Sequence, residues 1–185
     1  NLGLAFLTDF SWENGVSLLI GARHDRIDME SSTPVEKILF PDPDDSLEAD
    51  DDVSGNSWTV SLSYDIGNSG IIPYVTLSEQ STVIAGQGAE LQVGNVAGGT
   101  AFDSSELTEF GVKGELLEDD RLYFSLSHYE QERTDFSAQS IVTNQSVKTE
   151  GTEFEVRWAV NDSLFIGATY TNVEALNLNS IESGG

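Results

Sequence analysis

The chain has 185 residues, enough for one sizeable domain. It contains no Cys, which excludes a disulfide framework and a thiolate metal site, and it has no run of about 18 apolar residues that would form a membrane helix. Its formal net charge of −24 makes nucleic acid a poor partner, because phosphates would be repelled. A soluble halophilic protein and an acidic cell-surface protein would both have this composition.

The first two predicted strands, residues 2–12 and 16–25, form a hairpin. Apolar side chains alternate with polar or small ones in both, as in strands with one apolar face. Glu13-Asn14-Gly15 between them is a strong hairpin-turn signal. Residues 31–56 then predict a long loop, because prolines and the acidic run Asp42–Asp52 oppose a packed strand.

The second predicted hairpin contains the cleanest alternation in the chain. Residues 57–66 place Trp58 and every second residue after it on an apolar face, and residues 71–80 return after a Gly-rich turn. A second long loop, residues 81–105, follows and is rich in Gly. No segment has a convincing helical period.

Two more hairpins complete the pattern. Residues 106–116 and 121–135 form the third, and a third long loop covers residues 136–147. Residues 148–160 and 163–173 form the fourth, around an Asn-Asp pair that favours a tight turn.

The connections therefore alternate between short and long throughout the chain. This spacing is typical of an outer-membrane barrel with short periplasmic turns and long extracellular loops. The fold class predicted is all-β, an antiparallel up-and-down transmembrane β-barrel segment of about eight strands. Aromatic residues near both ends of the strands agree with two interfacial girdles, for which the candidates are Trp12, Trp158, Trp58, His128 and Tyr170. A soluble half-buried sheet is the alternative, although its strands are usually shorter.

The alternation in the last hairpin assigns side chains to the two faces of the wall. We expect Val156 and Trp158 to face lipid, and Glu155 and Arg157 to face the lumen.

Six short stretches resemble the barrel of TonB-dependent outer-membrane receptors, in particular those for ferric siderophores. They occur in the family's order and together cover nearly the whole chain. They are Gly21–Asp25, Tyr74–Gln80, Glu109–Lys113, Tyr129–Phe136, Gly151–Glu155 and Ala168–Asn172.

The resemblance implies a barrel of about 22 strands, an N-terminal plug inside it and energy supplied through TonB. Residues 1–185 contain no plug, no segment for contact with TonB and no terminal strand that ends in an aromatic residue. We therefore expect a single partial barrel domain from the later middle of the wall, cut out of a longer protein.

No arrangement of residues predicts an enzyme. Gly-x-Ser-x-Gly is absent, and Gly86-Gln-Gly88 is not followed by a helix that could bind phosphate. His24 and His128 lie on the apolar face, which favours interfacial aromatics over a catalytic or metal-binding pair. Asp42–Asp52 lacks the spacing of an EF-hand, so a solvated acidic loop is favoured over a Ca²⁺ site. We expect no cofactor and no metal.

The polar face of the predicted strands contains the candidate ligand-binding residues. Most polar residues there would form ion pairs or contact the plug. Those nearest the long-loop end would contact a ligand, and they are Arg23, Gln80, Tyr129, Gln131 and Arg133.

The resemblance implies a ferric siderophore or similar small ligand, TonB acting through the plug region, outer-membrane lipid as surroundings and the outer membrane of a Gram-negative bacterium as location. A complete small eight-stranded barrel or a β-sandwich with a structural or adhesive role is the alternative function, and an outer-membrane hydrolase is a third.

The receptor segment and the small eight-stranded barrel differ in whether the first and last strands pair with each other. A wide barrel curves too gently for eight neighbouring strands to meet. We therefore predict an open sheet in which residues 2–11 and 163–173 do not pair, whereas a small closed barrel requires a ladder between them.

Overall fold

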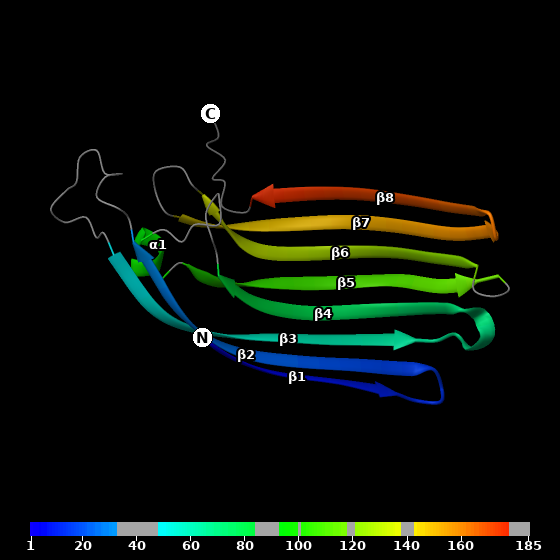
Figure 1. The fold of residues 1–185 in the computed structure, drawn as a ribbon, viewed down its shortest axis with the longest axis horizontal. Helices are drawn as coiled ribbons and strands as arrows, with labels where there is room; N and C mark the ends of the chain where they lie inside the picture. Colours follow the sequence, from blue (N-terminus) through cyan, green and yellow to red (C-terminus); the bar gives the residue numbers. More distant parts are fainter. Residues whose placement is uncertain (33–47, 84–92, 100, 118–120, 138–142, 178–185) are drawn as a thin grey trace.

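A computed structural model describes residues 1–32, 48–83, 93–99, 101–117, 121–137 and 143–177. They form one antiparallel sheet in which eight strands follow one another in chain order (Figure 1). The strands are β1 (Leu2–Ser11), β2 (Val16–Ser32), β3 (Glu48–Tyr64), β4 (Ile71–Val83), β5 (Phe102–Leu116), β6 (Leu122–Ser137), β7 (Thr143–Asn161) and β8 (Leu164–Asn177). The all-β, up-and-down architecture predicted from the sequence is confirmed.

The predicted short turns lie at one end of the sheet (Figure 1). Between β1 and β2, the Gly15 amide donates to the Trp12 carbonyl over 3.0 Å, and Gly15 adopts a φ of +89°, which glycine accepts without strain. Between β3 and β4, the short 3₁₀ helix η2 (Gly67–Ser69) ends at Gly70 in the left-handed conformation. Between β7 and β8, the Ser163 amide donates to the Asn161 side chain over 2.9 Å.

Several strands are longer than predicted at the opposite end. Residues 48–56 were expected in a loop, but they belong to β3 and pair with β2 as far as Ser32↔Glu48. The acidic residues are accommodated because Glu48, Asp50 and Asp52 are exposed, while Ala49, between Glu48 and Asp50, is buried. The third predicted loop is also shorter, since β6 continues to Ser137 and β7 begins at Thr143.

The second predicted loop contains the one α-helix among the described residues, α1 (Val93–Ala97), which the sequence did not predict. This single turn contacts β2 and β3 (Figure 1). No helix in the described part of the chain is long and apolar enough to cross a membrane.

One face of the sheet, here called the apolar face, presents large hydrophobic side chains directly to the surroundings. The register aligns them in rows across neighbouring strands, as in Phe10–Leu18–Leu62–Val75. Leu4 is 76% exposed and Phe6 62%. Such a continuous exposed band in a folded sheet indicates an apolar environment.

Polar groups end this band toward the longer connections. The Trp58 indole donates to Glu79 over 2.9 Å, His24 Nδ1 lies 2.9 Å from Asn56 Oδ1, and the ring of His128 lies 3.0 Å from Thr152 Oγ1. Both histidines lie on the apolar face, and their interfacial role stays a prediction.

The sheet is open. No ladder joins β1 to β8 in the portions of the chain that the structure describes, so the predicted open wall is confirmed and the closed eight-stranded barrel is wrong. β1 and β8 are therefore the two edge strands of the sheet, and they do not pair with each other.

Candidate functional site

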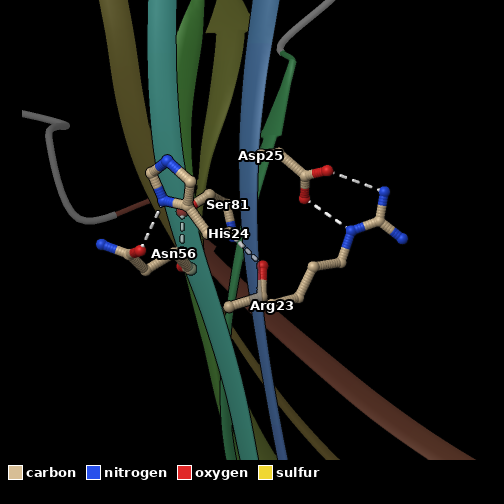
Figure 2. A network of polar contacts seen from close by, with 6 residues as sticks. Arg23, His24, Asp25, Asn56 and Ser81 are labelled. Carbon is tan, nitrogen blue, oxygen red and sulfur yellow. Dashed lines mark hydrogen bonds and ion pairs between the residues drawn. The ribbon is translucent and has the colours of Figure 1, made fainter. Parts of the chain in front are cut away.

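The opposite face, here called the polar face, carries the candidate residues near the longer connections. Arg23 and Asp25 lie two residues apart on β2 and therefore point to the same side. Their side chains form a bidentate ion pair, with Nε 2.6 Å from Oδ2 and Nη2 2.8 Å from Oδ1 (Figure 2). Arg23 remains 59% exposed and Asp25 18%, so the pair holds a guanidinium at the surface in a fixed orientation.

A wide trough with a volume of about 880 Å³ lies beside this pair. Gln80 of β4 lines it together with Arg23 and Asp25. Small side chains leave room along its base, namely Gly3, Ala5, Gly21, Ser57, Thr59 and Ser78. The trough therefore offers apolar surface with a few polar groups at the side, a combination typical of small-molecule sites.

A smaller pocket of about 200 Å³ adjoins the trough and shares Gln80 and Thr82 with it. Gln131 and Arg133 of β6 line this pocket, because the register places Gln80 opposite Ser105 and Ser105 opposite Arg133. The Gln131 amide donates to Ser105 Oγ over 3.1 Å. Four of the five predicted residues thus surround two adjoining hollows that meet at Gln80.

Tyr129 is not brought to either hollow. Its ring lies against Gly151 of β7, where a side chain on residue 151 would overlap with the ring. Gly151 is the residue opposite Tyr129 in the ladder, so the glycine provides the space that the tyrosine fills.

Sequence reasoning missed the partners that complete these hollows. Thr82 and Asp103 line the smaller pocket from the ends of β4 and β5, inside what was predicted to be a loop. Further down the same face, the Tyr74 hydroxyl donates to Glu109 over 2.7 Å, and Lys113 Nζ lies 5.6 Å from the centre of the Tyr74 ring. The parity of these residues was visible in the sequence, but their cross-strand neighbours were not.

Two basic groups lie beyond the apolar band, outside the part expected to span a membrane. A hydrogen bond with Asp52, over 2.8 Å, raises the pKa of the Arg26 guanidinium. Hydrogen bonds with Glu130 and then Glu150 raise the pKa of the Lys148 ammonium. Both groups are held in the charged form by neighbouring carboxylates.

No cluster of three or more His, Asp or Glu residues in the described ranges could bind a metal ion. The acidic run considered as a Ca²⁺ site lies partly outside the described residues, and its remainder, Glu48–Asp52, lies in β3.

Comparisons with known proteins agree with this fold. None of the curated proteins is a significant relative of the chain. Three solved structures share its fold. They are the siderophore receptor PiuA from Acinetobacter baumannii (14% identity, TM-score 0.76), the alcaligin outer-membrane receptor FauA from Bordetella pertussis (16%, 0.67) and the ferric-catecholate import receptor Fiu from E. coli K12 (16%, 0.73).

These alignments cover 94%, 95% and 96% of this chain but only 25%, 30% and 28% of the three receptors, so the chain spans less than a third of their length. The protein-family model described as "TonB dependent receptor-like, beta-barrel" matches residues 1–184. Because this match covers almost every residue, the chain belongs to the TonB-dependent receptor β-barrel family.

Proposed function

We propose that residues 1–185 form part of the wall of an outer-membrane receptor that takes up a ferric siderophore or a similar small ligand. In this proposal the apolar face contacts outer-membrane lipid in a Gram-negative bacterium, and the polar face lines the lumen. The plug, the TonB-contacting segment and the remaining strands belong to other parts of the receptor. Proteins of this family are receptors rather than enzymes.

The observation that supports this function best is the position of the two hollows. Polar-face residues of β2, β4 and β6 near the longer connections line them, where a ligand would arrive from outside in this proposal. Gln80, Gln131 and Arg133 converge there from strands that are distant in sequence. Amide and guanidinium groups beside apolar surface are suited to the oxygen-rich periphery of an iron chelate. The printed names of the three similar structures also refer to siderophores or iron complexes.

Ligand titration of the full-length receptor would test the proposal. The probes are a ferric trihydroxamate and a ferric tris-catecholate, with binding followed by quenching of tryptophan fluorescence. The double change Gln131→Ala with Arg133→Ala should weaken binding of the preferred complex at least about tenfold, which corresponds to loss of one charge-assisted hydrogen bond or more.

Glu132→Ala is a matched control, because Glu132 lies between these two residues and points to the other face. It should leave the affinity unchanged. Equal losses in both variants, or no loss in the double variant of a receptor that binds the complex, would contradict the assignment. A full-length receptor that binds neither complex would contradict the proposed ligand class.

A further inference from the structure

Five buried apolar side chains lie together toward the longer connections, and the two from β2 and β3 have the same parity as Arg23 and Asp25. They come from β2, from β3, from α1 and from the residue before β5, and we call them the extracellular joint. They are Met29, Ala49, Val93, Val96 and Ala101. Val96 is 1% exposed and Ala101 0%, in a sheet whose other apolar side chains are largely open to the surroundings.

The joint lies where β3 and β4 are no longer paired through their backbones. Pairing between β3 and β4 ends at Trp58↔Glu79, whereas β3 continues with β2 alone to Glu48. The end of β4 is instead attached through Ser81, whose hydroxyl donates to the Asn56 carbonyl over 2.7 Å and whose amide donates to Ser57 Oγ over 3.1 Å (Figure 2).

Gly55 of β3 leaves room for a second contact beside Ser81, with the ring of Phe102. A methyl group on this glycine would lie 2.5 Å from the Phe102 ring and 2.5 Å from the Ser81 side chain. Phe102 therefore packs directly on the β3 backbone, and it also contacts the joint. The first residue of β5 is thereby fixed to the middle of β3.

The joint adjoins both hollows of the candidate site. Ile27 and Val83 pack against the joint, and the same two residues line the trough. Thr82 and Asp103, which line the smaller pocket, are the chain neighbours of Val83 and Phe102. Displacement of the joint would move these residues, although none of its five members lines either hollow.

We propose that the extracellular joint makes the β2–β3 extension (residues 25–32 and 48–57) and the α1 segment one cooperative unit, which positions the outer end of the ligand trough. Val96 and Phe102 are positioning residues in this unit. The cooperative unit stands on the packing alone, and the effect on ligand binding rests on the proposed function.

Hydrogen exchange in the full-length receptor without ligand tests the cooperative unit. Val96→Asp places an unpaired charge in the joint, and Ala97→Asp, on the exposed side of the same helical turn, is the matched control. Val96→Asp should speed exchange about tenfold or more in residues 27–31 and 49–53 as well as in α1, because linked segments open together. Ala97→Asp should leave exchange in β2 and β3 unchanged. Faster exchange confined to α1 would overturn the proposal.

Ligand binding tests the positioning role. With the ferric trihydroxamate and tris-catecholate complexes as probes, Val96→Asp should weaken binding at least about fivefold, whereas the control Ala97→Asp should retain the affinity of the unaltered receptor. Heat-dependent gel migration confirms that the barrel is folded, and Val96→Ala replaces Val96→Asp if it is not. Spread of faster exchange with unchanged affinity would overturn the positioning role. Binding of neither probe by the unaltered receptor would refute the ligand class, and the exchange result would still decide the joint.

Discussion

Neighbouring residues on β8 allow a direct test of which face of the sheet meets lipid. Ala168 lies on the apolar face opposite Val156, and Thr169 lies on the polar face opposite Glu155. Both positions are exposed, so an arginine at either one displaces little packing. This pair is cleaner than Val156 and Glu155 themselves, because Glu155 forms an ion pair with Arg157 over 2.6 Å that its replacement would break.

The free-energy cost expected for Ala168→Arg depends on how deep residue 168 lies in the membrane. On β8 the apolar face runs through Leu164, Ile166, Ala168 and Tyr170. With a rise of about 3.4 Å per residue and a tilt near 45°, Ala168 lies about 5 Å below the Tyr170 end and about 10 Å above the Leu164 end. An arginine at this depth costs ~2–4 kcal/mol, or roughly 30- to 700-fold in the folding equilibrium. Thr169→Arg should cost nearly nothing, because Glu155 lies opposite.

The measurement is reversible unfolding of the full-length receptor in phospholipid vesicles, with denaturant midpoints and slopes compared for the two variants. Ala168→Arg should lower the free energy of unfolding, and Thr169→Arg should match the unaltered receptor. A similar loss in both variants, or a larger loss from Thr169→Arg, would refute the assignment of the faces.

Three further outcomes are expected. Gly151→Ala should destabilise the receptor by ~1–3 kcal/mol in the same assay, because the new methyl group overlaps with the Tyr129 ring; an unchanged midpoint would mean that the ring moves away freely. Trp58→Phe should cost ~0.5–1.5 kcal/mol through loss of the indole hydrogen bond to Glu79, and Glu79→Gln, which keeps an acceptor, should cost less; the reverse order would count against this hydrogen bond. Residues 1–185 alone should aggregate in detergent-free buffer, as measured by light scattering, because the edges of β1 and β8 and the apolar face are all open; a soluble monomer would contradict this reasoning.

The sequence predicted the spanning part of every strand because alternation is a local signal. A side chain such as Val156 differs from its neighbours Glu155 and Arg157 in polarity, and this contrast is present in the sequence itself. The tight turns were likewise visible in the sequence, since Asn14-Gly15 and Asn161-Asp162 favour hairpin turns. The prediction was most accurate where one face of the sheet is apolar and the other polar, because this contrast imposes a strict pattern.

The ends of the strands were not predictable because their pattern depends on distant partners. The acidic residues of Glu48–Asp52 look like a loop until β2 is placed beside them and Ala49 is buried against α1. The α1 turn has too few residues for a helical period to show. The candidate site had the same difficulty, because Gln80, Gln131 and Arg133 were recognised by parity alone, while the hollow they share depends on the register of three strands.

The composition agreed with both a soluble halophilic protein and an acidic cell-surface protein, and the position of the acidic residues favours the second. Counted from the end with the short turns, the apolar face of β7 carries Val160, Trp158, Val156 and Phe154 and then Thr152 and Glu150. On β5 it carries Val112 and Phe110 and then Thr108 and Glu106. Carboxylates thus begin at a corresponding place on different strands, beyond a band that contains none. A soluble halophilic protein has no reason to keep charge away from an exposed band, whereas lipid imposes this exclusion at a cost of a few kcal/mol per charge. The carboxylates of the described strands thus lie beyond the apolar band or on the polar face, as expected for part of an outer-membrane barrel wall.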